Sequence, residues 1–311
     1  MSVLLDIVVP VFGVVALGYL AGATGLFGAE RLRGLSFFAF GFAIPALLFR
    51  SMARMTLDGA IAWPFLLSYY LGAFALFGAG LLVSRLAFRQ PLAESGAAAL
   101  GASYSNTVLL GIPLLLTAFG ERASLPVLLL VAFHAALILP VATLVLELGR
   151  GAPGRLREIP AATGRSLLRN PILWGLGLGL AWNASGWALP AMLDSLLQTM
   201  GRAAVPCALF AMGASLVGYR VRGVPLEPLA LCSLKLLAMP GLVWLLGTQA
   251  FVLDLLWLKV AVLMAALPAG VNVYVFAQQY EANADGAAAT VLLSTVLSVA
   301  SVSGLLFLFG P

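Results

Sequence analysis

Apolar stretches recur along nearly the whole chain, separated mostly by short connections that contain glycine, proline or charged residues. Each stretch has roughly the 20 residues that an α-helix needs to cross the hydrocarbon core of a bilayer. Because lipid offers no water to unpaired backbone groups, only helices and closed barrels can span it. Apolar residues make up 62% of the chain and charged residues 9%, against about 25% charged in a soluble domain. The sequence therefore predicts an all-α protein embedded in the lipid bilayer.

The apolar stretches predict ten transmembrane helices. One longer connection, residues 150–169, separates a first half of the chain, 1–149, from a second half, 170–311. We expect this connection to be a cytoplasmic linker. The predicted spans are 4–22, 34–52, 63–86, 95–118, 124–148, 170–187, 194–217, 228–249, 255–280 and 286–309.

The two halves resemble each other in the positions of glycine and proline. One offset places Pro45 over Pro206, and a slightly shorter offset places Pro113 over Pro268. Each half holds an odd number of predicted spans, so the second half must enter the membrane from the opposite face. This arrangement predicts two inverted five-helix repeats, as in many secondary transporters.

Lysine and arginine are distributed unevenly over the predicted connections, with eleven on one side and five on the other. The richer side should be cytoplasmic, which places both termini outside. The same distribution accounts for the formal charge of +5. Basic residues are not interleaved with aromatic ones in a stripe, as a nucleic-acid surface requires, so nucleic acid is not expected as a partner.

Two predicted spans, the fourth and the ninth, carry an interruption of asparagine, glycine and proline. In the fourth span the ring of Pro113 should clash with the carbonyl of Leu109 and break the helix. Irregular backbone at membrane depth survives only when it is buried in protein or lines a cavity, which predicts a substrate site where the two breaks meet. The residues expected to form it are Ser105, Asn106, Gly111, Pro113, Pro268, Gly270, Val271 and Asn272.

The chemistry of these breaks favours an anion. Each break starts a new half-helix, and helix N-termini carry a positive partial charge. Asn106 and Asn272 add neutral donors and acceptors. For either break taken alone, a simple proline kink is the alternative, because neighbouring groups repair many such kinks.

Several other positions stand out by residue type, and most of them allow two interpretations. Lys235, inside the eighth span, is either functional or extends its ammonium to the interface. His134, the only histidine, either makes a hydrogen bond between helices or relays protons. Pro45 and Pro206 should bend spans two and seven, with packing as their default role. The glycines of 175–179 should permit close helix contact rather than bind a ligand.

Several classes of protein are excluded or disfavoured by what the sequence lacks. No acidic residue is evident at the middle of a span, which argues against an obvious proton or sodium coupling site. The motifs of intramembrane enzymes and of ATP pumps are absent, so we expect no catalytic residues. No metal site or cofactor is expected either, because Cys207 and Cys232 are isolated.

Three motifs resemble those of the auxin efflux carrier (PIN-like) family, in its bacterial branch, and the resemblance covers the whole chain. They are the run 106–114, the element that starts at 268–272 and continues to Tyr280, and the pair Lys235 and Pro240. The resemblance implies a multi-pass protein of the bacterial inner membrane. It also implies a fold like that of the bile acid/sodium symporters, in which the broken fourth and ninth helices cross.

The resemblance further implies how such a carrier works. Spans 1, 2, 6 and 7 would form a scaffold that also makes a homodimer, and spans 3–5 and 8–10 a transport domain that moves like an elevator. The substrate would be a small organic anion such as an indole acid, malate or malonate, with Asn106 and Asn272 at its carboxylate and Pro113 and Pro268 holding the crossing open. The scaffold side of the pocket would include Pro45, Leu48 and Pro206.

The leading function is therefore efflux of a small carboxylate, with Lys235 and His134 as possible support or coupling residues. A sodium- or proton-coupled importer of dicarboxylates or bile-acid-like compounds is the alternative within the same class. A passive channel and an intramembrane enzyme are more remote alternatives.

Overall fold

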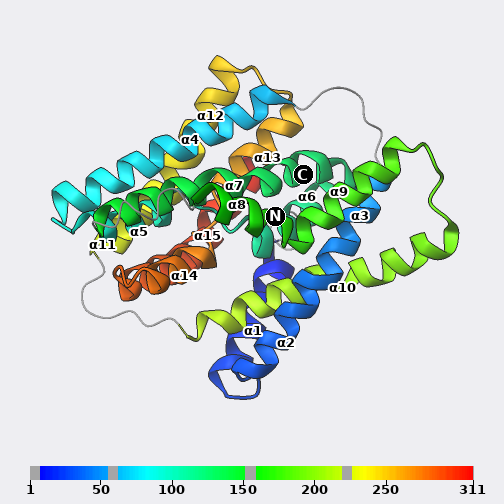
Figure 1. The fold of residues 1–311 in the computed structure, drawn as a ribbon, viewed down its shortest axis with the longest axis horizontal. Helices are drawn as coiled ribbons and strands as arrows, with labels where there is room; N and C mark the ends of the chain where they lie inside the picture. Colours follow the sequence, from blue (N-terminus) through cyan, green and yellow to red (C-terminus); the bar gives the residue numbers. More distant parts are fainter. Residues whose placement is uncertain (1–7, 55–61, 151–158, 219–225, 311) are drawn as a thin grey trace.

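The computed structural model describes residues 8–54, 62–150, 159–218 and 226–310, and in this part every regular element is a helix (Figure 1). The prediction of an all-α protein is confirmed. Five helical stretches are long and apolar enough to cross a membrane, by length and composition. They are Ala29–Ala53, Trp63–Ala87, Thr107–Gly149, Leu226–Ala250 and Ala284–Phe309.

The helices follow the predicted ranges closely. In the first half they are α1 (Val9–Ala23), α2 (Ala29–Phe38), α3 (Ile44–Ala53), α4 (Trp63–Leu82), α5 (Leu92–Ser103), α6 (Ile112–Phe119) and α7 (Ser124–Gly149). In the second half they are α8 (Ile159–Leu168), α9 (Pro171–Ala184), α10 (Ala191–Leu216), α11 (Leu226–Ser233), α12 (Met239–Leu245), α13 (Leu255–Ala265), α14 (Val271–Gln279) and α15 (Ala284–Phe309). The sequence reading missed α8, which lies within the expected linker. Residues 151–158 of that linker lie outside the described part.

Short π-helical and 3₁₀ turns join several of these helices. The π turns are η2 (Ala39–Ala43), η3 (Val83–Ala87), η4 (Thr107–Gly111), η7 (Leu234–Ala238) and η8 (Leu246–Ala250), and the 3₁₀ turn is η5 (Gly120–Ala123). Three of the π turns end two residues before a proline, at Pro45, Pro113 and Pro240. A π turn inserts one residue into the helix, which moves the carbonyl that the proline ring would otherwise strike. The expected break at Pro113 is therefore wrong, because η4 runs directly into α6.

By packing, the helices form two groups. One contains α1, α2, α3, α9 and α10, and within it α1 lies along α10 and α3 along α9 (Figure 1). The other contains α4, α5, α7 and α11 to α15, in which α4 packs on α5 and α11 on α15. The arm formed by η4 and α6 contacts both groups, through α10 on one side and α7 on the other.

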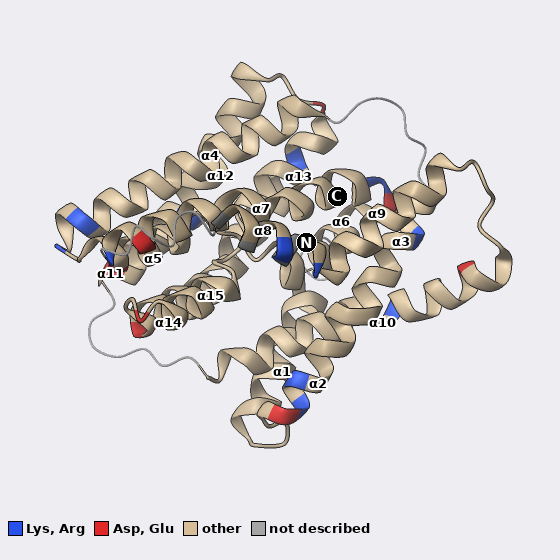
Figure 2. Ribbon diagram, viewed as in Figure 1, with Lys and Arg blue, Asp and Glu red and all other residues tan. Residues whose placement is uncertain are grey.

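Charge is confined largely to helix ends, while long stretches of α4, α7 and α15 carry none (Figure 2). Large apolar side chains are exposed instead, among them Leu17 and Leu20 on α1 and Leu67 and Leu71 on α4. An exposed apolar surface of this extent marks a membrane-facing protein rather than a soluble one.

Glycines set the closest helix contacts. Gly175 and Gly179 on α9 face the backbone of α3, and a Cβ on either would lie 2.6 Å from a backbone oxygen. This confirms the expectation of close helix contact at these two positions, although nothing lies within 4 Å of Gly177. Small residues at helix interfaces let backbones approach in the membrane.

Gly213, on α10, is the tightest of these positions, and Gly213→Ala is expected to destabilise the protein. A Cβ there would lie 1.8 Å from the carbonyl oxygen of Val15 on α1, so the two backbones would have to separate. Such overpacking costs about 1–3 kcal/mol. The measurement is the melting temperature of the purified protein in detergent. Gly13→Ala on α1, where nothing lies within 4 Å, is the control and should not lower it; equal melting temperatures for the two variants would contradict this packing.

Candidate functional site

The helix after α5 and the helix after α13 both start beyond a short extended segment, and these two segments cross. They run antiparallel and exchange two backbone hydrogen bonds, each of 2.9 Å. The N–H of Asn106 donates to the carbonyl of Pro268, and the N–H of Gly270 donates to the carbonyl of Tyr104. The expected meeting of two broken helices is therefore present, although the first break lies at 104–106 rather than at Pro113.

Ser105 and Ala269 face each other at the centre of this crossing. The N–H of Ser105 donates to Nε2 of His134 on α7, and the N–H of Ala269 donates to Oγ of Ser294 on α15, both at 3.0 Å. All four residues are buried. Because an unpaired backbone group in this environment would be costly, these two side chains hold the crossing in place.

A cavity of about 310 Å³ opens beside the crossing. This volume lies within the range of small-molecule sites. Its wall combines amide, hydroxyl and imidazole groups with apolar side chains and contains no charged residue. The lining residues are Phe40, Tyr104, Ser105, Asn106, Thr107, Val108, Leu109, Val131, His134, Ala135, Asn170, Ile172, Gly270, Val271 and Asn272.

His134 lines this cavity, and one of its ring nitrogens has no hydrogen-bond partner among the described residues. Its Nε2 accepts from the backbone of Ser105, so the proton of the neutral ring is on Nδ1. Among the described residues, Nδ1 of His134 has no partner although the atom is buried. The ring of Tyr104 lies 4.4 Å from it, centroid to centroid, and fixes its orientation. The expected hydrogen bond of His134 is present only in part, because its partner is the extended segment at the crossing rather than a helix and its second nitrogen is unsatisfied.

The two asparagines lie on opposite sides of the crossing and both line the cavity. Asn272 is exposed there, and its Nδ2 donates to the hydroxyl of Tyr104 at 3.0 Å. Asn106 is buried, and its Nδ2 contacts the sulfur of Met212 at 3.6 Å, a weak acceptor. Nδ2 of Asn106 thus has only a weak partner, whereas Nδ2 of Asn272 makes a normal hydrogen bond.

Some of the remaining predicted site residues line the cavity, and others do not. Ser105, Gly270 and Val271 line the cavity with the asparagines and His134. The predicted residues that do not line it are Gly111, Pro113, Pro268, Lys235, Pro45, Leu48 and Pro206. Pro113 and Leu48 are fully buried, Pro206 lies inside the continuous helix α10, and Pro45 packs against Gly175.

Three polar residues of the site were missed by the sequence reading. Tyr104 lines the cavity, and Tyr69 on α4 donates from its hydroxyl to Oγ of Ser105 at 3.0 Å. Asn170 caps the N-terminus of α9, where its side chain accepts from the N–H of Ile172. An asparagine before Pro171 is a capping signal, whereas nothing in the local pattern marks the tyrosines.

Lys235 is completely buried, and its Nζ donates to the carbonyl of Ala265, the last residue of α13. The reading in which this side chain reaches to the interface is therefore wrong. Among the described residues, no carboxylate pairs with the ammonium. Its positive charge lies instead at the negative end of a half-helix that leads into the crossing.

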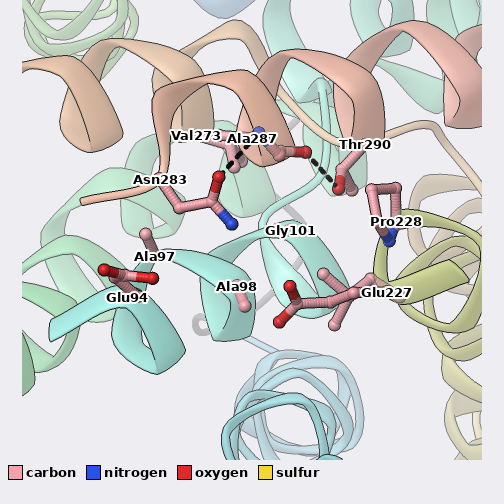
Figure 3. A pocket seen from close by; sticks show the side chains of 12 residues that line it. Glu94, Ala97, Ala98, Gly101, Glu227, Pro228, Val273, Asn283, Ala287 and Thr290 are labelled. Carbon is pink, nitrogen blue, oxygen red and sulfur yellow. Dashed lines mark hydrogen bonds between the residues drawn. The ribbon is translucent and has the colours of Figure 1, made fainter. Parts of the chain in front are cut away.

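A separate small cavity lies between α5, α11, α14 and α15 (Figure 3). Its volume is about 10 Å³, room for about one water molecule. Glu227 on its wall is buried and accepts from Oγ of Ser84 at 2.6 Å and Nε2 of Gln90 at 3.2 Å. The buried acids Glu147 and Glu227 lie near helix ends, as the absence of acids at mid-span led us to expect.

Comparison with known proteins identifies the family. A protein family described as "Membrane transport protein" matches residues 3–306 of the chain. A protein of Rhizobium meliloti (strain 1021) named "Putative malonate transporter" is 30% identical over 308 residues, which cover 99% of this chain and 96% of that protein. An Escherichia coli (strain K12) protein, "Uncharacterized transporter YfdV", is 26% identical over 87% of this chain and 86% of its own length.

A plant protein extends the comparison. The "Probable auxin efflux carrier component 5c" of Oryza sativa subsp. japonica is 31% identical over 144 residues, which cover 44% of this chain and 38% of that protein. The family description spans nearly all of the chain, and it is a family of transporters and not of enzymes. The chain therefore belongs to the membrane transport protein family, which includes the auxin efflux carriers.

Proposed function

We propose that this protein carries a small organic anion, bound by its carboxylate in the cavity beside the crossing. The observation that supports this most is the buried, unpartnered Nδ1 of His134 on the cavity wall. A neutral site with amide and hydroxyl groups on its wall suits an anion that must also leave, because no fixed countercharge holds it. The relative whose name refers to malonate makes dicarboxylates of that size the first substrates to examine.

The ends of the half-helices add to the attraction. α14 starts at Val271 with Gly270 as its N-cap, and no side chain caps this N-terminus. Val271 and Asn272 both line the cavity. The first amides of a helix have no intrahelical partner, and together with the helix dipole they favour an anionic oxygen. Asn272 and His134 would then approach the same carboxylate from different helices.

We further propose that transport moves one group of helices against the other. The chain would span the bacterial inner membrane ten times, as two inverted repeats with both termini outside. The group containing α1, α3, α9 and α10 would be the scaffold and the dimer interface, and the group containing α4, α5, α7 and α11 to α15 the moving unit. The arm η4–α6 contacts both groups, so it would slide along α10 during the movement. Efflux is the proposed direction.

The test is uptake of radiolabelled malonate into proteoliposomes. Asn106→Ala and Asn272→Ala should each weaken the apparent affinity by about tenfold to a hundredfold, because each removes one hydrogen bond to a charged group. Asn183→Ala on α9, away from the cavity, is the control. If both site variants fold and transport malonate like the parent while malonate remains a saturable substrate, the site assignment is wrong.

The same vesicles separate this proposal from its alternatives. A carrier should show counterflow, in which unlabelled internal malonate accelerates entry of external label. A channel would not show it. A cation-coupled importer would lose activity when sodium is replaced by potassium or when the proton gradient is collapsed, whereas the proposed carrier responds only to the membrane potential.

A further inference from the structure

We propose that the protein has a second anion site at the other end of the arm η4–α6, which binds a small carboxylate on the opposite face from the crossing. This inference rests on the proposed function for the class of ligand, but it concerns a different cavity. That cavity has a volume of about 320 Å³. Its lining includes Arg50, Leu116, Glu121, Ser124 and Arg202.

Ser124 is the first indication of a ligand. It lines the cavity, is 3% exposed, and its Oγ has no hydrogen-bond partner among the described residues. A buried hydroxyl without a partner is destabilising, so an occupant that accepts from it would be stabilising. Among the described residues, the Oγ of Ser124 and the Nδ1 of His134 are the two buried side-chain nitrogen or oxygen atoms without a hydrogen-bond partner. His134 lines the cavity beside the crossing, and Ser124 lines this second cavity.

The backbone at the start of α7 is already paired. The 3₁₀ turn η5 (Gly120–Ala123) leads directly into this helix, and the N–H of Ser124 donates to the carbonyl of Glu121. The Ser124 hydroxyl, and not the backbone of the helix, is therefore the group that an anion would meet.

Arginine side chains supply the charge. Arg50 is mostly buried and binds Asp194 through Nε at 2.8 Å, and it contacts Glu121 at 3.4 Å. Arg54 binds the same aspartate at 3.2 Å. Arg202 lines the cavity, is exposed, and makes no ion pair within the described part of the chain. The three arginines together carry one more positive charge than the two carboxylates, Asp194 and Glu121, can neutralise.

The acidic residues of the cluster do not fill the cavity. The Glu121 side chain lines it but is 87% exposed, so solvent screens most of its repulsion of an anion. Asp194 is already engaged by two arginines. A carboxylate could therefore bind Arg202 and the hydroxyl of Ser124 without displacing an existing ion pair.

The two cavities lie at opposite ends of one helical arm. Leu109 lines the cavity at the crossing and Leu116 lines the second one. Seven helical residues place them about 10 Å apart along the arm, at about 1.5 Å per residue. Buried Leu110, Leu114 and Leu115 fill the arm between them. A solute would thus meet one anion site on each side of an apolar barrier.

The experiment is equilibrium binding of radiolabelled malonate to the full chain in phosphatidylcholine nanodiscs. The parent should show two saturable components. Arg202→Gln and Ser124→Ala should each weaken one component at least tenfold and leave the other unchanged, and the double variant Asn106→Ala/Asn272→Ala should affect only the other. Arg122→Gln is the matched control, because Arg122 is an exposed arginine next to Glu121 that does not line the cavity.

Each outcome of this experiment either supports or overturns the second anion site. A single component in the parent that Arg202→Gln leaves unchanged, or equal binding by the Arg202→Gln, Ser124→Ala and Arg122→Gln variants, overturns the second site. If phosphatidylglycerol in the nanodisc abolishes the Arg202-dependent component, the site takes lipid headgroups and the proposal for a soluble carboxylate is wrong. If the asparagine variants change nothing while Arg202→Gln removes a component, the proposed function of the crossing fails and the second site stands.

Discussion

His134→Ala is expected to reduce malonate binding and transport by about tenfold to a hundredfold, and to lower stability as well. The substitution removes the donor that Nδ1 presents to the cavity, and a hydrogen bond to a charged ligand is worth about 1.5–3 kcal/mol. It also leaves the N–H of Ser105 without its acceptor. A buried unpaired group of this kind costs about 1–3 kcal/mol. The measurements are malonate affinity and the melting temperature of the same purified sample.

Ser294→Ala provides the control that separates these two effects. Ser294 accepts from Ala269 at the same 3.0 Å at which His134 accepts from Ser105, but it does not line the cavity. We expect this variant to lose stability by a similar amount and to keep the affinity of the parent. If the two variants lose affinity equally, His134 acts only by holding the crossing, and the assignment of Nδ1 to the substrate is wrong.

The sequence predicted the helices well because a lipid environment restricts the chain to few solutions. Backbone groups must be paired within each span, so the length of an apolar stretch nearly determines its helix. The one additional helix, α8, lies in the expected linker. Nothing in the apolar pattern indicated it, since it is too short and too polar to count as a span.

The site was predicted in part, and the errors concern proline. Pro113 was expected to break a helix, but the π turn η4 accommodates it, and the break falls earlier, at 104–106. The expected clash between a proline ring and the carbonyl four residues earlier assumes that this stretch is an α-helix. Whether a helix widens instead depends on its neighbours, which the local sequence does not contain.

The side chains that hold the crossing could not be predicted from the local sequence, for the same reason. Tyr104, Tyr69 and Ser294 contribute through contacts with residues at least 25 positions away in the chain. Asparagine next to glycine and proline is unusual in an apolar span and could be recognised. A serine or tyrosine in a membrane helix is common and carries no such signal until the fold brings its partner to it.

Lys235→Met is expected to leave stability unchanged or to raise it by about 1–4 kcal/mol, by analogy with the range seen when apolar residues of similar volume replace a buried ion pair. The ammonium is fully buried and has one hydrogen bond, to the carbonyl of Ala265. Removing it relieves the cost of burying a charge, which is several kcal/mol. Leaving the carbonyl without its donor costs less, about 1–3 kcal/mol.

Transport by the same variant should fall at least tenfold, because a buried cation retained at such a cost is expected to act in function. Its charge lies at the end of α13, directly before the crossing, where it offsets the negative end of the helix and favours an anion nearby. Lys259→Met is the control, since Lys259 lies on the same helix but is only partly buried and bonds to Gly310 near the chain end. Malonate flux and melting temperature, measured together, decide the point. A variant that is less stable yet transports normally would show that Lys235 serves only to cap α13.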